Sequence, residues 1–124
     1  MQVSISKFTP IKEAGVECLS YERKDSVNCF CPAIAFYHAT DCWIRGIEGQ
    51  KSISAHVLLE SSSNISISGC YFHHAFAYDG VSMHGYGLAL YYHTGQCLIE
   101  NNIFKHLRHS LSFQCGANGN VVSY

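Results

Sequence analysis

Short segments in which apolar and polar residues alternate recur along the chain at nearly constant spacing. One series consists of Cys42-Trp43-Ile44, Ile65-Ser66-Ile67, Cys97-Leu98-Ile99 and Val121-Val122-Ser123. A second consists of Ile34-Ala35-Phe36, Val57-Leu58-Leu59, Leu88-Ala89-Leu90 and Leu111-Ser112-Phe113. In both series the first and last steps are nearly equal and the middle step is longer by about eight residues, so the two series follow one repeat.

The alternation within each segment predicts a β-strand, because successive side chains of a strand point to opposite faces. The segments are short, and Gly, Ser, Asn and Asp residues bound them. A third strand in each repeat is indicated at 69–72 and 101–104, which are separated by the same long step, with a shorter equivalent near Gly46-Ile47. A helical periodicity is not sustained anywhere.

A single repeat cannot bury its apolar side alone, so we expect the repeats to stack as coils of an all-β solenoid. About four coils fit into the chain. Like residues of successive coils then form inward columns. The predicted columns are Ile34, Val57, Leu88 and Leu111; Phe36, Leu59, Leu90 and Phe113; and Cys42, Ile65, Cys97 and Val121.

Two stretches carry a resemblance to a known superfamily. NISISGCYFHH (64–74) and QCLIENNIFKHLRHS (96–110) resemble coils of the right-handed parallel β-helix, or pectin-lyase-like, superfamily. Their apolar-x-apolar pattern, followed by Asn or Gly and then an aromatic residue, is typical of it. The resemblance covers about residues 15–124 and implies a right-handed parallel β-helix. It also implies an extracellular or cell-surface protein that acts on or binds polysaccharide, with no cofactor and without specifying one reaction.

The chain reads as one domain over residues 1–124, with loops that leave the solenoid at about 22–32 and 75–86. The last coil reaches Tyr124 with no capping element after it, and solenoids normally end in caps. We therefore expect the same solenoid to continue beyond Tyr124, which makes the chain a fragment of a longer solenoid. The asparagines at positions 64, 101, 102, 118 and 120 cluster at the predicted turns, where Asn tolerates left-handed backbone and bonds neighbouring backbone groups.

The extra residues of the long repeat form a candidate binding loop. It contains Tyr78, Asp79, His84 and Tyr86. Aromatic faces with polar edges suit sugar rings, and long loops of solenoids often carry binding function. The alternative is a compact loop that packs its own aromatic residues onto the coil.

Histidines near this loop form the second candidate feature. The long step of the repeat maps His74 onto His106 and predicts that the two stack on adjacent coils, and Arg108 and His109 follow one coil from the root of the loop. Such basic groups serve as a general base or hold a substrate carboxylate. The predicted catalytic residues are Arg108, His109 and Asp79, and the predicted substrate-binding residues are Tyr78, His84, Tyr86, His74 and His106. The alternative is a stacked, structural histidine pair.

A metal site built from His73, His74 and His106 is disfavoured, because adjacent side chains of a strand point to opposite sides. No metal is therefore predicted. The acids of the repeat region also give no catalytic pair, since no two of them align on neighbouring coils. They are Asp41, Glu48, Glu60, Asp79 and Glu100. Glycoside hydrolysis commonly needs two carboxylates, and the acidic calcium cluster of pectate-lyase-like sites is absent.

Composition excludes some functions. The net charge is −1, charged residues make up 14% of the chain, and no basic stripe is present, so nucleic-acid binding is not expected. No run approaches the roughly 18 apolar residues of a membrane-spanning helix, and the first residues do not resemble a secretory signal.

Seven cysteines are present, with no CxxC pair and no spacing typical of a disulfide framework. Most are predicted to be small buried apolar residues. Free cysteines argue against an oxidising compartment, in conflict with the extracellular location that the resemblance implies. Two functions remain open: a carbohydrate-active lyase, hydrolase or polysaccharide binder, and a structural or adhesive surface solenoid without catalysis.

Overall fold

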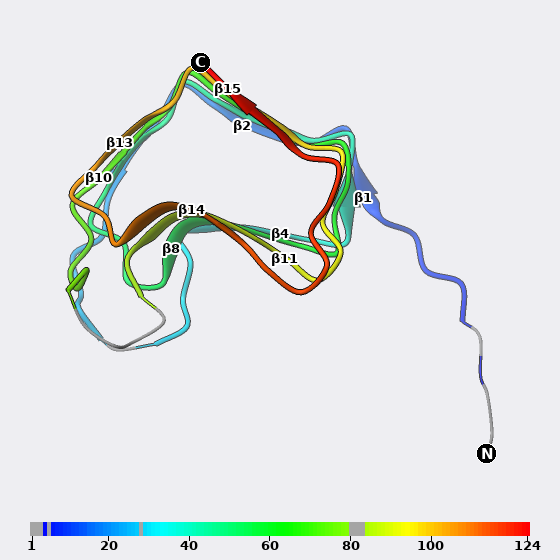
Figure 1. Cartoon of the computed structure of the whole chain (residues 1–124), viewed down its shortest axis with the longest axis horizontal. Helices are drawn as coiled ribbons and strands as arrows, with labels where there is room; N and C mark the ends of the chain where they lie inside the picture. The colour runs from blue at the N-terminus through cyan, green and yellow to red at the C-terminus, as the bar shows by residue number, and fades with distance from the viewer. Residues whose placement is uncertain (1–3, 5, 28, 80–83) are drawn as a thin grey trace.

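The computed structural model describes residues 4, 6–27, 29–79 and 84–124, which form parallel β-strands and turns (Figure 1). Sheet I contains β2 (Gly15–Glu17), β6 (Trp43–Arg45), β9 (Ser66–Ser68), β12 (Leu98–Glu100) and β15 (Val121–Ser123). Sheet II contains β3 (Ser20–Glu22), β7 (Glu48–Gln50), β10 (Tyr71–His73) and β13 (Ile103–Lys105). Sheet III contains β4 (Ile34–Tyr37), β8 (Ala55–Glu60), β11 (Tyr86–Tyr91) and β14 (His109–Phe113). In addition, β1 (Ile11–Lys12) pairs with β5 (Ala39–Thr40).

Within each sheet the strands come from successive passes of the chain, and Figure 1 shows these passes lying over one another. The register confirms the predicted repeat: Val57 pairs with Ile34 on one side and with Leu88 on the other. The third series is confirmed as well, since Tyr71 pairs with both Glu48 and Ile103. The fold is therefore all-β, with parallel strands in stacked sheets, and is consistent with a solenoid.

The inward columns form one core. Val57, Leu88, Leu59 and Leu90 are completely buried, and Ile34 and Leu111 pack against the same cluster. Burying such a side chain contributes on the order of 1.5–3 kcal/mol to stability. Phe113, at the end of its column, is 42% exposed. No helix in the described part of the chain is long and apolar enough to cross a membrane.

Each corner between sheets is made by a residue with left-handed backbone, and the next side chain points into the core. Along one pass these corner residues are His38, Asp41, Gly46 and Lys51, with φ between 52° and 63°. The residues that follow them are Ala39, Cys42, Ile47 and Ser52, and all four are buried. The predicted left-handed role is confirmed for Asn64 and Asn101, whose φ values are 55° and 53°.

The structure corrects one predicted column. Val121 pairs with Leu98, so Asn120 and not Val121 follows Cys97 in the inward column. The Asn120 side chain accepts a hydrogen bond from the Cys97 nitrogen at 3.0 Å and donates one to the Thr94 carbonyl at 3.2 Å. An asparagine occupies this inward position because its amide satisfies backbone groups of the preceding coil.

The cysteines fall into three groups, and the prediction that most of them are buried is wrong. Cys42, Cys70 and Cys97 are buried, and the thiol of each lies 3.2–3.4 Å from the carbonyl oxygen two residues earlier. Cys18 and Cys115 are free and exposed. Cys29 and Cys31 form a disulfide, which no framework-like spacing indicated.

A polar pair of buried His56 and half-buried Tyr21 joins sheets II and III. The Tyr21 hydroxyl and His56 Nδ1 are 2.7 Å apart, and the His56 ring also lies 5.3 Å from that of Phe72. Gly49 leaves room for this pair, because a Cβ there would collide with the Tyr21 hydroxyl and lie 2.9 Å from His56 Nδ1. Burial lowers the pKa of His56 to about 3, so the imidazole is neutral near pH 7.

The chain leaves the stack between β10 and β11 and rejoins it in register. The Phe76 nitrogen donates to the Ser52 carbonyl at 3.0 Å, and the Gly85 nitrogen donates to the next carbonyl, that of Ile53, at 2.7 Å. Residues 77–84 therefore lie between two consecutive bonding positions of the previous coil. This segment accounts for the added length of the long repeat, and Gly80 to Met83 lie outside the described residues.

Candidate functional site

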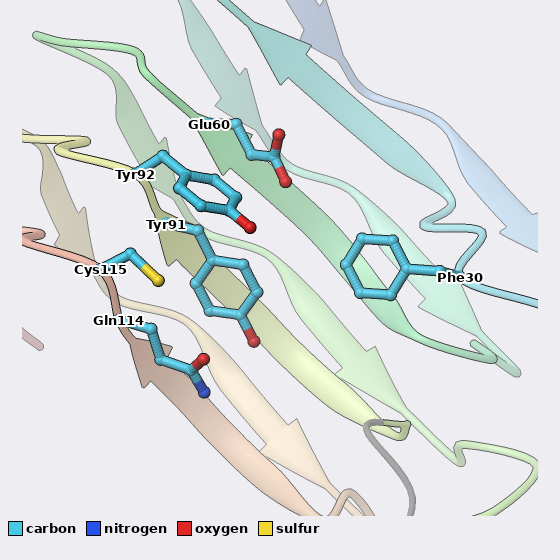
Figure 2. A pocket seen from close by; sticks show the side chains of 6 residues that line it. All are labelled: Phe30, Glu60, Tyr91, Tyr92, Gln114 and Cys115. Carbon is cyan, nitrogen blue, oxygen red and sulfur yellow. The ribbon is translucent and has the colours of Figure 1, made fainter.

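A groove of about 330 Å³ lies where the strands of sheet III end (Figure 2). Its lining residues are Phe30, Glu60, Tyr91, Tyr92, Gln114 and Cys115. Aromatic side chains dominate this set, and one carboxylate and one amide supply the polar groups. An apolar hollow with a few polar groups is the usual form of a small-molecule binding site.

Alternation along sheet III determines which side chains reach the groove. Leu59 and Leu90 point into the core, so Glu60 and Tyr91, which follow them, point outward. The register pairs Glu60 with Tyr37 on one side and Tyr91 on the other. Three aligned outward residues from successive strands therefore stand about 4.8 Å apart.

The turn after β11 places a second tyrosine beside the first. Tyr92 and His93 both have left-handed backbone, at φ 49° and 62°, and Tyr92 is 52% exposed. The Tyr91 and Tyr92 rings are 6.5 Å apart and nearly perpendicular, at 89°. The Tyr91 hydroxyl lies 3.3 Å from the Ser112 hydroxyl, and burial raises the pKa of Tyr91. Tyr91 thus forms a fixed floor, while Tyr92 offers an open face.

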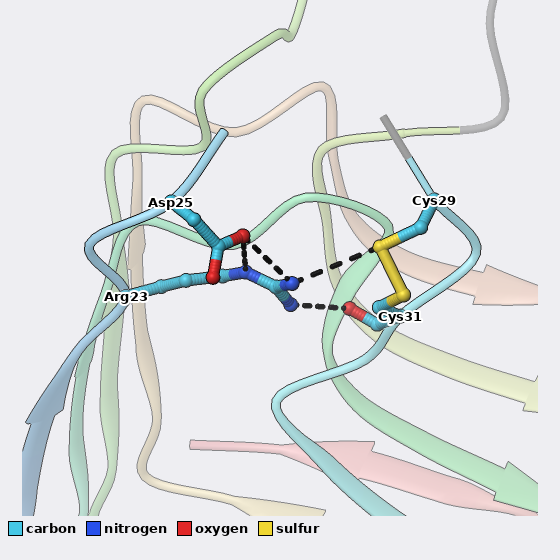
Figure 3. The surroundings of a disulfide bond; sticks show 4 residues. All are labelled: Arg23, Asp25, Cys29 and Cys31. Carbon is cyan, nitrogen blue, oxygen red and sulfur yellow. Dashed lines mark hydrogen bonds and ion pairs between the residues drawn. A yellow bond between two sulfur atoms is a disulfide. The ribbon is translucent and has the colours of Figure 1, made fainter. Parts of the chain in front are cut away.

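The opposite wall comes from the segment between β3 and β4, which Figure 3 shows around its disulfide. Phe30 lies between the two bonded cysteines and is 49% exposed. Arg23 holds the segment: its guanidinium donates to the Cys31 carbonyl at 3.0 Å and to Asp25 at 3.1 Å. These bonds fix the Phe30 backbone beside the groove.

On the two middle strands of sheet III, β8 and β11, the outer face is apolar and largely buried, which is unusual for an outward face. Leu58 and Ala89 are each 1% exposed and cluster with Ala55, Tyr86 and Tyr91. The Ala33 nitrogen donates to the Ala55 carbonyl at 3.1 Å, which extends the ladder between β4 and β8 back to the end of the segment from β3. Figure 1 shows that segment leaving the outline of the stacked coils beside β8.

The residues predicted from the long loop lie at the other end of the same sheet. Tyr86 begins β11 and its ring stacks on His109, with centroids 5.5 Å apart. Tyr91 ends that strand five residues later, which corresponds to about 17 Å. The Arg108 nitrogen donates to the Gly85 carbonyl at 2.8 Å, and His84 is half-buried nearby in sequence. Tyr78 and Asp79 are exposed.

The predicted stacking of His74 on His106 is confirmed, with ring centroids 4.7 Å apart and an angle of 25°. Both histidines occupy left-handed corner positions, at φ 56° and 51°. Loss of hydration against neighbouring groups, then the positive charge of His106, lowers the pKa of His74. This pair belongs to the corner after sheet II and contributes nothing to the groove lining.

The expectation that His73 and His74 point to opposite sides is wrong. Their Nδ1 atoms are 2.7 Å apart, because the left-handed backbone of His74 turns its side chain back toward its neighbour. His73 Nε2 also lies 3.3 Å from a Glu48 carboxylate oxygen. Among the described residues, however, no group of three or more His, Cys, Asp or Glu side chains is arranged to hold a metal ion.

The groove was not found from the sequence. Glu60 stood out there only as an acid without a partner, and Tyr91 and Tyr92 received no role. The outward positions of Glu60 and Tyr91 could have been predicted from the sequence. The residue after each inward leucine points outward, and the repeat aligns positions 60 and 91. Phe30 gave no such signal, because it lies outside the repeating segments.

Comparison with protein-family models, with curated proteins and with solved structures gives no match to this chain. The class of the protein therefore rests on its own geometry: an all-β chain of stacked parallel strands with an aromatic groove at one end of sheet III.

Proposed function

We propose that this chain is part of an extracellular, right-handed parallel β-helix protein that binds polysaccharide in the groove at the end of sheet III. The observation that carries the proposal is the combination of Tyr91, Tyr92 and Phe30 with the polar groups of Glu60 and Gln114 in one groove of about 330 Å³. The right hand follows the strong preference of parallel β-crossovers.

Sugar rings have apolar C–H faces and hydroxyl edges, and this groove offers groups for both. The half-exposed rings of Tyr92 and Phe30 supply flat apolar surface. The carboxylate of Glu60 accepts hydrogen bonds from hydroxyls, and the Gln114 amide both donates and accepts them. Such a set favours polysaccharide over a peptide strand, because outward ring faces line the groove, whereas an added strand needs a free backbone edge.

Binding is favoured over hydrolysis. Glu60 is the only carboxylate among the described residues that line the groove, whereas glycoside hydrolases commonly use two. The groove also lies about 17 Å along β11 from Tyr86, whose ring stacks on the predicted catalytic residue His109. We therefore assign a non-catalytic, polysaccharide-holding role to the groove.

An oxidising location is supported by the Cys29–Cys31 disulfide, since disulfides persist mainly outside the cytosol. Three of the five free thiols are buried in the core and so are shielded from oxidation. This arrangement reduces the conflict between the many cysteines and an extracellular or cell-surface protein.

The test compares two tyrosines of equal exposure. Tyr92 is 52% exposed in the groove, and Tyr78 is 50% exposed in the loop predicted from the sequence. Isothermal titration with a panel of polysaccharides should show Tyr92→Ala weakening binding about ten-fold, which corresponds to roughly 1.4 kcal/mol. Tyr78→Ala should leave binding unchanged.

If Tyr78→Ala weakens binding and Tyr92→Ala does not, the binding site lies in the loop predicted from the sequence and not in the groove. If the unmodified protein binds no polysaccharide of the panel, the proposal fails, and a structural or adhesive solenoid becomes the better description. Release of unsaturated or new reducing-end products would instead overturn the non-catalytic assignment.

A further inference from the structure

The charge of the groove is set by one residue. Of the six lining residues, only Glu60 carries a formal charge near neutral pH. Within the described part of the chain it takes part in no ion pair, whereas Glu17, Glu22 and Glu48 all have basic partners. Its carboxylate therefore meets any bound molecule without a compensating cation.

Glu60 stands at one edge of the groove floor, next to Tyr91, which lies between Glu60 and Gln114 on successive strands. It is paired in register with Tyr37 on β4 and with Tyr91 on β11, and all three side chains point outward. Strands of a sheet are about 4.8 Å apart. A sugar ring lying against Tyr91 is thus within reach of the Glu60 carboxylate.

The nearby cations are either paired already or lie elsewhere. Arg23, which holds the Phe30 segment, is paired with Asp25 at 3.1 Å and donates to the Cys31 carbonyl at 3.0 Å. Lys51 sits at the corner that ends sheet II and is paired with Glu22 at 2.7 Å. Lys105 is the last residue of β13, and Arg108 precedes the start of β14. These last three cations lie at the beginning of the sheet III strands, whereas Glu60 lies at the end of β8.

We infer that the groove selects glycans that lack acidic groups and excludes polyuronates. This inference rests on the proposed polysaccharide binding and names the substrate class. A carboxylate held against Glu60 would lose hydration and gain a like-charge neighbour, which disfavours binding. Hydroxyls, or the ammonium group of an amino sugar, donate to the same carboxylate and gain a charge-assisted hydrogen bond.

Three hexasaccharides of different charge test the inference at pH 7.5 and low ionic strength: a neutral glucan, its glucosamine counterpart and an oligogalacturonate. Isothermal titration should give an affinity for the oligogalacturonate at least ten-fold below that for the better of the other two. Glu60→Gln should reduce this difference in affinity several-fold, because the substitution removes the charge of the side chain and keeps its shape. Glu100→Gln is the matched control and should leave this affinity difference unchanged. Glu100 is half-buried and ends β12 in sheet I, as Glu60 ends β8, and it takes part in no ion pair within the described part of the chain.

Binding of the two oligomers without acidic groups should depend differently on salt concentration. Binding of the glucosamine oligomer should weaken as salt is raised from about 0.01 to 0.15 M, where screening shortens from about 30 to 8 Å. Binding of the neutral glucan should not change.

Each failure has its own signature. Tightest binding of the oligogalacturonate, or an unchanged affinity difference in Glu60→Gln, overturns the inference while polysaccharide binding stands. Absence of binding by all three oligomers, and by the wider polysaccharide panel, overturns the proposed function and the inference together. Circular dichroism of both glutamine variants should match the parent spectrum.

Discussion

Asn102 joins two coils: its side-chain oxygen accepts a hydrogen bond from the Cys70 nitrogen at 2.9 Å, and its amide donates to the Ile67 carbonyl at 2.9 Å. Asn120 repeats this arrangement with Cys97 and Thr94 at the corner before β15. Both asparagines stand where earlier coils carry apolar or cysteine side chains. They therefore replace core packing by hydrogen bonds to the backbone of the preceding coil.

Asn102→Ala should lower the free energy of unfolding by about 1–3 kcal/mol, because it leaves the Cys70 nitrogen without its partner and removes one hydrogen bond to the Ile67 carbonyl. Urea unfolding followed by circular dichroism measures the change. Asn118→Ala is the control, since that exposed side chain bonds only the nearby Gly116 carbonyl. Equal losses in the two variants would contradict the assigned role.

Gly49→Ala should destabilise the fold by about 1–3 kcal/mol, the usual range for overpacking a core. The added methyl group would collide with the Tyr21 hydroxyl and with the His56 ring. Gly69→Asn tests the contrast, because Gly69 has left-handed backbone, which Asn tolerates, and no atom within 4 Å of an added Cβ. Gly69→Asn should lower the free energy of unfolding by less than about 1 kcal/mol. If it destabilises the fold more than Gly49→Ala does, the packing assigned to Gly49 is wrong.

His56 should make stability depend on pH between about 6.5 and 3. Its folded-state pKa of about 3 lies below the ordinary value, so the unfolded chain binds a proton first as the pH falls. The stabilisation from neutral His56 is complete above pH 6.5 and decreases by up to about 1.4 kcal/mol per pH unit below it. NMR titration of the imidazole should show no midpoint above pH 4.

The same linkage predicts a difference between variants. From pH 7 to pH 5, the unfolding free energy of the unmodified protein should fall by roughly 2 kcal/mol more than that of His56→Asn. A midpoint for His56 near 6.5, or identical pH slopes in the two proteins, would show that the ring is not held neutral by burial.

Reducing the Cys29–Cys31 disulfide should lower the affinity for glycan several-fold and change the free energy of unfolding only slightly. The bond closes a very short loop, and loop-closure stabilisation grows with loop length, so the effect on unfolding should be small. Phe30 lies between the two cysteines, so its position in the groove wall depends on the bond. Titration of the double variant Cys29→Ser/Cys31→Ser should show a several-fold loss of affinity.

Cys18→Ser serves as the matched variant for that experiment, because Cys18 is a free, exposed thiol outside the groove. It should bind like the unmodified protein. If it loses as much affinity as the double variant, the effect comes from general thiol replacement and the role given to the Phe30 wall is wrong.

The stacking was predictable from the sequence because one strand position repeats through Ile34, Val57, Leu88 and Leu111, and apolar burial selects such positions in every coil. The error at Val121 has the same origin. Apolar alternation alone favoured the valine, whereas hydrogen bonding to the Cys97 nitrogen places Asn120 inward. Patterns of hydrophobicity carry no signal for an inward asparagine.

The groove was less predictable, because it joins a repeating and a non-repeating part of the chain. Positions 60 and 91 follow from the repeat, yet nothing in the periodic pattern places Phe30 opposite them. The contact of His73 with His74 was not predicted either, because the alternation of side chains along a strand ends where the backbone becomes left-handed at His74. The positions of strand residues were therefore predictable, whereas those of residues at corners and in segments outside the repeat were not.

The bonds of Phe76 and Gly85 to the consecutive carbonyls of Ser52 and Ile53 have a consequence for engineering. These two bonds use adjacent carbonyls, so the register of the stacked strands is the same on both sides of the junction and does not depend on how many residues lie between the two anchors. This junction should accept a foreign peptide or tag of varied size. The stacked coils would then act as a rigid display platform, with the aromatic groove undisturbed at the far end of the same strands.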